Sequence, residues 1–217
     1  AVGAAELAAA RGWGLFHGLN APFWLALPAS LLILDLAIYT QHVVFHKVAV
    51  LWRLHRMHHT DLDFDVTTAL RFHPLEIVLS MLIKLVLVTL LGVPAVAVML
   101  FEVILNATAM FNHGNVGLPR RLDRALRWIL VTPDMHRVHH SIRPEETDSN
   151  FGFNLPWWDR LFGTYRDQPR DGHAGMTIGL EYFRDRRATR LYGLLLQPFL
   201  NPASGSTPAP TPSNPLP

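Results

Sequence analysis

The chain of 217 residues contains no cysteine, and this absence removes several kinds of site at once. Disulfides, thiolate zinc sites, iron–sulfur clusters and a thiolate-ligated haem all require a cysteine sulfur. Charged residues are also scarce, at 17% of the sequence against roughly 25% in an average soluble protein. Half of the residues are apolar, and many of these stand in long runs.

Several short motifs are missing as well. The sequence has no G-x-G-x-x-G for a dinucleotide, no phosphate-binding P-loop and no haem-binding H-P-G-G. The zinc-protease pattern H-E-x-x-H is also absent. The net charge is only +2, and no block of basic residues is interleaved with aromatic residues, so we expect no nucleic acid partner.

Three apolar runs have the length of membrane-spanning helices. They cover residues 23–41, 75–91 and 94–112, and as helices each would be about 26–29 Å long, close to the hydrocarbon thickness of a bilayer. Gly92-Val93-Pro94 predicts a tight turn between the second and third runs. Helices buried in a large soluble core are the alternative, but three such runs in so short a chain favour a membrane protein.

Histidines form the most informative pattern. Residues three or four apart on a helix are rotated by only about 60° or 40°, so clusters with that spacing point toward one place. A single histidine on an apolar face is more often a core residue with its hydrogen bonds satisfied, but three clusters favour metal binding. The three clusters and the isolated His113 supply more ligands than one tetrahedral ion can bind, so they suit two metal ions. Nitrogen ligands that leave coordination positions open favour iron over a purely structural ion. The clusters are His42-x3-His46, His55-x2-His58-His59 and His136-x2-His139-His140.

The order of the runs predicts where these histidines lie. If the first run ends near Gln41, residues 42–73 lie on one side of the membrane, and the hairpin of the second and third runs returns the chain to that side before His113. Of the 19 lysines and arginines, 17 then lie on the histidine side, leaving Arg11 and Lys84 elsewhere. The positive-inside rule makes that side cytoplasmic. A re-entrant hairpin would place the histidines in the same way.

Polar side chains within the runs follow the faces that carry the histidines. A carboxylate in lipid costs roughly 2.5–3.5 kcal/mol on insertion scales, so such residues usually face the interior of a bundle. We expect them to hydrogen-bond to metal-bound histidines or, alternatively, to link helices without a role in catalysis. Lys84 is expected to face another helix or to reach toward the membrane surface. The candidates are Asp35 and Tyr39 in the first run and Glu102 and Asn106 in the third.

The remaining segments complete an all-α prediction, a membrane-embedded bundle with a cytosolic helical cap. The main domain is expected over residues 21–190, after an N-terminal remnant (1–20) that is either truncated or cleaved, and before a tail (191–217) that is disordered from about residue 201. Residues 120–130 are amphipathic and basic, which is typical of a helix at the membrane surface. Thr132-Pro133-Asp134 predicts a helix start. The aromatic segment 151–165 is expected either to cover the metal site or to lie among lipid headgroups.

The motifs together resemble the fatty acid hydroxylase / sterol desaturase superfamily of integral-membrane diiron oxygenases. The resemblance covers about residues 34–180, and the last two segments are also similar to those of alkylglycerol monooxygenases. Acyl-CoA desaturases have a longer gap than the eight residues between His46 and His55, so they match less well. The resemblance rests on the segments QHVVFH (41–46), LHRMHH (54–59), TTALRFHPLE (67–76), FNH (111–113), TPDMHRVHH (132–140) and NFGFNLPWWDRLFGTY (150–165).

The resemblance implies a cofactor and a reaction. The eight clustered histidines and His113 match the metal ligands of the family, His73 before Pro74 is a further candidate, and Ala109 stands where some members have another histidine. Two irons would use O2 to hydroxylate or desaturate a membrane lipid, whether a sterol, a fatty acyl chain or an ether lipid. Electrons would come from a ferredoxin or cytochrome b5-like donor fed by NAD(P)H. A membrane zinc hydrolase and a non-enzymatic metal-binding membrane protein are the alternatives.

Overall fold

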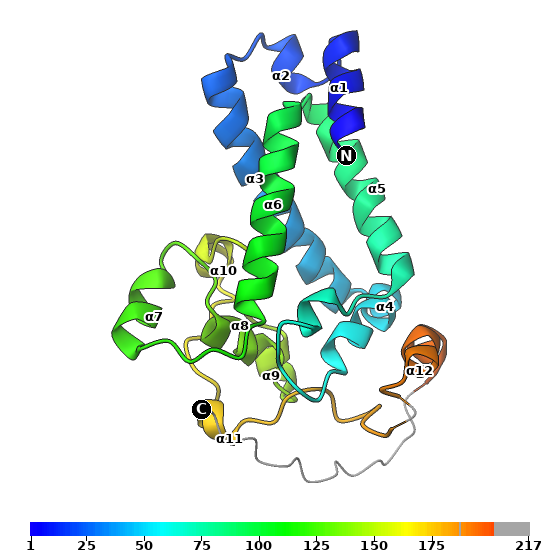
Figure 1. The fold of residues 1–217 in the computed structure, drawn as a ribbon, viewed down its shortest axis with the longest axis vertical. Helices are drawn as coiled ribbons and strands as arrows, with labels where there is room; N and C mark the ends of the chain where they lie inside the picture. Colours follow the sequence, from blue (N-terminus) through cyan, green and yellow to red (C-terminus); the bar gives the residue numbers. More distant parts are fainter. Residues whose placement is uncertain (187, 202–217) are drawn as a thin grey trace.

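The computed structural model describes residues 1–186 and 188–201, and every named element within these ranges is a helix. Figure 1 shows a tall part made of long helices above a wider part made of short helices and loops. The prediction of an all-α protein is therefore confirmed.

Three helices form the tall part and match the predicted runs. They are α3 (Phe23–Lys47), α5 (Pro74–Leu91) and α6 (Ala95–Asn112), and all are long and apolar enough to cross a membrane. Their outward side chains, such as Trp24 and Val103, are exposed, which suits helices surrounded by lipid. Helix α3 continues beyond Gln41 to Lys47, so the first two histidines lie in its last two turns.

The far end of the bundle is closed by the N-terminal segment. Residues 1–20, expected as a remnant, form α1 (Val2–Arg11) and α2 (Leu15–Gly18). Ala5 of α1 is buried in one cluster with Val88 and Ala97 from α5 and α6. The predicted turn between those helices is confirmed, since Gly92 ends α5 in the left-handed region with φ 68°.

A break separates the first two histidine clusters. Helix α3 does not continue through the second cluster, because Val48 is extended (φ −99°, ψ 112°) and ends it. Helix α4 (Ala49–His59) begins directly after it and packs against α3. Because the chain reverses here, clusters that are adjacent in sequence face each other from two helices.

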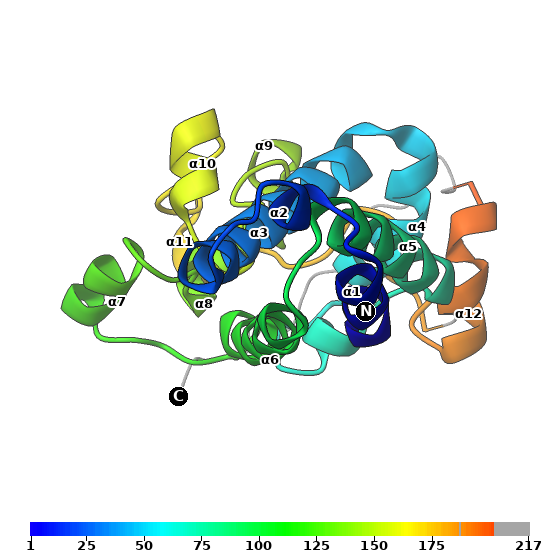
Figure 2. The same cartoon turned by 90° about the horizontal axis from the view of Figure 1, so that it is seen from above.

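The short elements form a cap at the lower ends of the long helices. Helix α8 (Pro133–His139) begins where the sequence predicted, with Thr132 Oγ1 accepting a hydrogen bond from Met135 N. Seen from above, α7 (Arg120–Leu126) and α12 (Leu191–Leu196) lie at opposite edges of the molecule (Figure 2). The other cap elements are η1 (Thr68–Leu70), α9 (Pro144–Thr147), α10 (Trp157–Phe162), α11 (Gly172–Gly175) and η2 (Gln197–Phe199).

The beginning of the expected tail is packed on the cap. The guanidinium of Arg56 in α4 donates to the carbonyl oxygens of Gln197 and Leu200, and η2 packs against α4. Residues 191–201 therefore support the helix that carries the second histidine cluster. The disorder predicted from about residue 201 concerns residues 202–217, which lie outside the described residues.

The contact between Gly14 and Gly92 provides a test of the fold. A Cβ on Gly14 would lie 2.1 Å from Gly92 N, and Gly14 has φ 102° and ψ 164°, a conformation open almost only to glycine. We expect Gly14→Ala to lower the free energy of unfolding by about 2 kcal/mol or more, measured as a lower Tm in detergent.

Gly3→Ala is the matched control, because a Cβ there meets no atom within 4 Å and alanine favours a helix. An unchanged Tm for Gly14→Ala would contradict the close packing of these two turns.

Candidate metal centre

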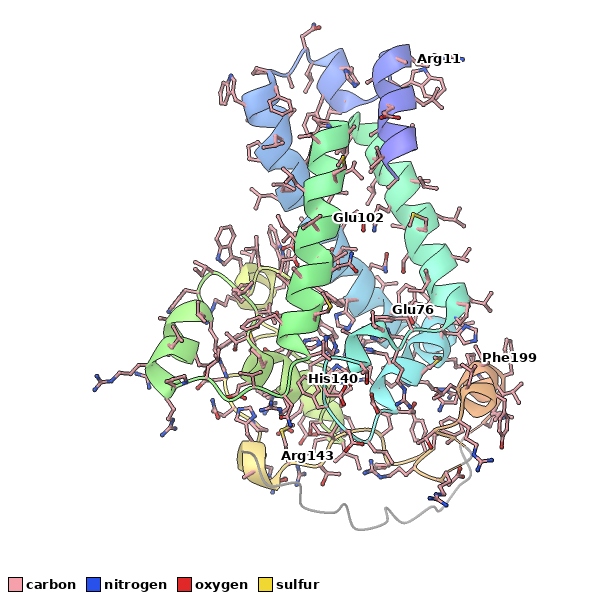
Figure 3. The ribbon with its side chains drawn as sticks, viewed as in Figure 1. Arg11, Glu76, Glu102, His140, Arg143 and Phe199 are labelled. Carbon is pink, nitrogen blue, oxygen red and sulfur yellow. The ribbon has the colours of Figure 1, made fainter. Side chains whose placement is uncertain are left out.

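Nine histidines gather where the long helices meet the cap, and their ligand atoms form two groups. Within each group one ring nitrogen from every histidine lies within 4.8 Å of the others. In Figure 3, His140 lies below the lower end of α6. The five-histidine group is His42, His46, His55, His59 and His139, and the four-histidine group is His58, His113, His136 and His140.

The division runs through two pairs of neighbouring residues. His58 and His59 end α4 and belong to different groups, as do His139 and His140 at the end of α8. Consecutive helical residues are rotated by about 100°, so neighbouring imidazoles point to different places. Two short helices therefore supply ligand atoms to both groups.

Hydrogen bonds fix the tautomer of two rings in the five-histidine group. His42 Nδ1 lies 2.8 Å from the carbonyl oxygen of Phe151, and His55 Nδ1 lies 2.7 Å from Glu76 Oε1. Both Nδ1 atoms must donate, so in neutral rings both Nε2 atoms carry lone pairs. These two Nε2 atoms are only 3.1 Å apart. Two lone pairs at that distance repel each other unless a cation is shared between them.

The four-histidine group also contains ring nitrogens that face one another or have no hydrogen-bond partner. His113 Nδ1 lies 2.8 Å from the carbonyl oxygen of Ala109, which makes it a donor and leaves Nε2 as an acceptor. That Nε2 lies 3.2 Å from His58 Nε2 and 3.0 Å from His136 Nε2. Both ring nitrogens of His140 are buried without a hydrogen-bond partner. Unsatisfied buried nitrogens are costly, and a bound cation would satisfy them.

Burial keeps these rings neutral. It lowers the pKa of His113 to about 4 and that of His139 to about 3, despite a hydrogen bond from each ring to a backbone carbonyl. The pKa values of His58, His59, His136 and His140 are lowered well below the usual value by the same cause. At pH 7 the nitrogens are therefore available to a metal rather than protonated. The donor set fits two divalent metal ions.

Two carboxylates that the sequence analysis missed hold histidine rings in place. Glu76 contacts His55 as described above, and Asp148 Oδ1 lies 3.3 Å from His46 Nδ1. Glu76 lies in the first turn of α5, at the histidine end of a membrane-length run, and this position could have indicated it. Asp148 lies in an irregular loop after α9, where no sequence pattern marks it.

The structure gives the four predicted supporting residues other partners. Trp158 Nε1 donates to Asp35 Oδ2 (2.7 Å), and Tyr39 Oη lies 2.9 Å from Thr164 Oγ1. Lys84 Nζ donates to Glu102 Oε1 (2.6 Å), and Asn106 Nδ2 donates to the carbonyl of Glu102 (2.8 Å). These four residues have the helical spacing of the histidines in their runs, but the carboxylates that contact histidine rings are Glu76 and Asp148.

His73 caps the beginning of helix α5. Its Nδ1 accepts a hydrogen bond from Leu75 N at the start of α5, and its Nε2 lies 3.2 Å from the carbonyl oxygen of Leu195. Both ring nitrogens are thus in use, and His73 belongs to neither histidine group. Metal binding by His73 stays a prediction, and in this structure the ring caps α5.

The aromatic segment 151–165 covers the metal site with one part, as one of its two predicted roles requires, and exposes aromatic rings with the other, whose place among lipid headgroups stays a prediction. The Phe151 ring packs 5.0 Å from His46 and 5.5 Å from His139, while Trp157 and Phe162 of α10 are exposed. Asp159 ties the two parts together, since its carboxylate accepts hydrogen bonds from the backbone N–H groups of Phe151 and Gly152, both at 2.8 Å. Asp159 therefore positions the Phe151 carbonyl that orients His42.

Two cavities reach the five-histidine group. The larger, of about 350 Å³, lies among α3, α5 and α6, and His42 and His55 are part of its wall. The exposed residues Ile77 and Met81 also line it, so it reaches the outer face of the helical bundle. The smaller, of about 260 Å³, lies in the cap and is lined by His46, Trp52, Asp148 and Tyr182, among others.

Three membrane-length helices that meet two groups of buried histidines at one end of the bundle indicate a membrane protein that binds metal. The pattern of the family described as "Fatty acid hydroxylase" matches residues 27–164, well over half of the chain. The chain belongs to the fatty acid hydroxylase family, as its histidine motifs predicted.

Similar characterised proteins act on lipids. The chain is 30% identical over 149 residues to the ornithine lipid hydroxylase OlsE of Rhizobium tropici, covering 69% of this chain and 44% of that protein. It is 30% identical over 154 residues to alkylglycerol monooxygenase of Xenopus tropicalis (69% and 32%) and 28% identical over 160 residues to that of Homo sapiens (71% and 34%). The chain thus spans less than half the length of these relatives. No solved structure matches it.

The two histidine groups lead to a prediction about metal content. We expect wild-type protein to bind two iron ions, and His58→Ala or His139→Ala to lower the iron content by at least one ion, because each variant removes a ligand from one of the two groups. Elemental analysis of purified protein measures this directly.

His17→Ala is the control, since His17 lies in α2 at the opposite end of the bundle and in neither histidine group. Equal iron loss in all three variants would contradict the assignment.

Proposed function

We propose that the protein oxidises an unactivated C–H bond of a membrane lipid, using O2 and two iron ions held by the two histidine groups. The observation that supports this most strongly is the pair of facing Nε2 atoms of His42 and His55, 3.1 Å apart at the wall of a cavity among the membrane-length helices. Metal ligands and a space for lipid thus meet at one place.

The residues around the ligands serve to orient them and to exclude water. Two iron ions bound there would supply the redox chemistry that reduces O2 and breaks the C–H bond. Glu76 and the Phe151 carbonyl hold His55 and His42 in the tautomer that presents Nε2. The Phe72 ring stacks on His58 at 4.5 Å, and Phe64 lies 5.7 Å from His113, so apolar surface covers the four-histidine group.

A lipid is the substrate class that the larger cavity favours. Its volume of about 350 Å³ is at the lower end of small-molecule sites. Ile38, Phe45 and Leu105 give it apolar walls, and its opening faces the hydrocarbon layer that would surround α5 and α6. The relatives named above, an ornithine lipid hydroxylase and alkylglycerol monooxygenases, carry lipid substrates in their names, which supports the same class.

The cap is proposed to lie in the headgroup layer on the cytoplasmic side. Exposed apolar residues occur on both flanks, Trp128 and Leu161 on the side of α7 and α10, and Leu191 and Phe199 around α12. Arg120, Arg121 and Arg124 of α7 add positive charge. Arg11 lies at the opposite end of the bundle (Figure 3), which agrees with the concentration of lysine and arginine on the cap side.

Electrons are proposed to arrive from a separate donor, a ferredoxin or a cytochrome b5-like protein fed by NAD(P)H. The smaller cavity offers a route from the cap side, because His46 and Asp148 form part of its wall together with Trp52 and Tyr182. Trp52 Nε1 donates to Tyr182 Oη (3.2 Å), and the Trp52 ring lies 4.8 Å from His46. Redox-active side chains thus connect the cap with the five-histidine group.

An isotope experiment tests the reaction. Membranes containing the full protein, supplied with NADPH and ¹⁸O2, are expected to yield a lipid carrying one ¹⁸O atom if the reaction is hydroxylation, or lacking two hydrogens if it is desaturation, both detected by lipid mass spectrometry. The His58→Ala protein should give neither product.

Purified protein with NADPH and O2 alone should be inactive until a ferredoxin or cytochrome b5 with its reductase is added. Turnover without O2, together with one zinc ion per chain, would refute the proposal in favour of a zinc hydrolase.

The absence of cysteine allows a clean test of orientation. Single cysteines introduced by Glu145→Cys in the exposed part of α9 and Glu6→Cys in α1 lie at opposite ends of the molecule. In intact cells, a membrane-impermeant maleimide is expected to label position 6 and to label position 145 only after permeabilisation.

The unsubstituted protein provides the background, because it has no thiol. Labelling of position 145 in intact cells would place the histidines on the opposite side of the membrane.

A further inference from the structure

An ion pair lies in the wall of the larger cavity, midway along the membrane-length helices. Lys84 Nζ of α5 is 2.6 Å from Glu102 Oε1 of α6, and the two side chains are 11% and 32% exposed. Both residues line the cavity that reaches His42 and His55. In Figure 3, Glu102 lies at mid-height of α6, well above Glu76 and His140. The pair is thus inside the proposed lipid-binding space but away from the metal ligands.

Stability alone does not explain these charges. One ionised side chain near the middle of a bilayer costs roughly 2.5–3.5 kcal/mol on insertion scales, and apolar residues often replace a buried ion pair without loss of stability. Helices α5 and α6 are already joined by the turn at Gly92, and α1 packs against both of them, with Ala5 in one buried cluster with Val88 and Ala97. Ionisable residues within membrane helices therefore usually indicate a functional site.

Other polar groups line the same cavity. Gln41 Nε2 donates to Ser80 Oγ (2.8 Å), and both residues belong to the cavity wall, as does Asn106. Ser80 lies one helical turn from Lys84, and Asn106 lies one turn from Glu102. A purely hydrocarbon chain would leave these groups without further partners.

The distance between the ion pair and the metal centre is set by two helices independently. Lys84 follows Glu76, the partner of His55, by eight residues on α5, which is about 12 Å along the helix axis. Glu102 precedes Ala109, the partner of His113, by seven residues on α6, which is about 10 Å. A ligand that contacts the pair therefore presents to the metal centre an atom about 10–12 Å away.

The chemistry of the pair selects an uncharged polar group. Lys84 offers N–H donors and Glu102 offers an acceptor oxygen, and their charges cancel. A hydroxyl group can accept from the first and donate to the second. A carboxylate could accept from Lys84 but would be repelled by Glu102, and an ammonium group would meet the reverse problem.

We infer that the cavity binds a lipid alcohol, with its hydroxyl group between Lys84 and Glu102 and its chain directed toward His42 and His55. This inference rests on the proposed lipid oxidation and names the substrate class for it. Lys84 and Glu102 would then determine specificity, because holding the hydroxyl group fixes which carbon along the chain reaches the metal centre.

Binding of three probes of equal chain length tests the inference. Protein in lipid nanodiscs is equilibrated with radiolabelled 1-dodecanol, dodecane or dodecanoate, and empty nanodiscs correct for partition into the lipid. We expect wild-type protein to bind 1-dodecanol at least about tenfold more tightly than the other two, because hydrogen bonds to charged groups are among the strong ones.

The double variant Lys84→Leu/Glu102→Leu should lose this preference and bind dodecane at least as well as 1-dodecanol. The polar variant Lys84→Gln/Glu102→Gln keeps donors and acceptors and should retain part of it. Arg143→Leu/Asp171→Leu is the matched control, because it removes an ion pair of 2.7 Å in the cap, outside the cavity, and should behave as wild type.

Iron content separates this inference from the proposed function, since Lys84 and Glu102 belong to neither histidine group. Both Lys84/Glu102 variants should retain wild-type iron. Equal binding of the three probes by iron-loaded wild-type protein, or an alcohol preference that survives in the iron-loaded leucine variant, would overturn the inference while leaving lipid oxidation intact. Absence of any lipid oxidation by wild-type protein would instead overturn the proposed function.

Discussion

The structure depends on imidazole lone pairs that are forced to face one another in a buried space. Backbone carbonyls and the Glu76 carboxylate use the Nδ1–H groups of His42, His55 and His113, so the Nε2 atoms of these rings have no proton to donate when neutral. Burial lowers the pKa of His113 to about 4, so this ring does not escape the conflict by taking up a proton at neutral pH. The remaining solution is a cation, and the rest of the fold serves to keep these nitrogens together: a break at Val48 turns α4 back on α3, and α8 and the loop at Phe151 complete the enclosure.

Much of this could be predicted because helical periodicity is a local property. The spacing of the clusters and the length of the apolar runs indicated which histidines share a face and that they lie at one end of three helices. Their division into groups of five and four was not predicted, because it depends on the different directions of adjacent rings at His58–His59 and His139–His140. The contacts of Glu76 and Asp148 with the rings were also missed, since these pairs join residues 21 and 102 positions apart. Asp35 and Tyr39 have the predicted helical spacing, but their partners Trp158, in α10, and Thr164, just after it, are more than 120 positions away in the sequence.

The metal centre lies where the long helices meet the cap, whereas the cavity gives the membrane-length helices a chemical role of their own. Its walls combine apolar side chains with polar ones such as Gln41, Ser80 and Lys84. Helices that served only to anchor the cap would need no such lining. The same helices that place the histidines near the membrane surface therefore also form the space from which a lipid would approach them.

The division of neighbouring histidines between two groups has a mechanical consequence. The last turn of α4 supplies one ring to each group, and so does the end of α8. Neither helix can shift to release an ion from one group without displacing a ligand of the other. Two ions bound to these groups would therefore load and leave as a cooperative unit, in which the first ion orders the helix ends that bind the second.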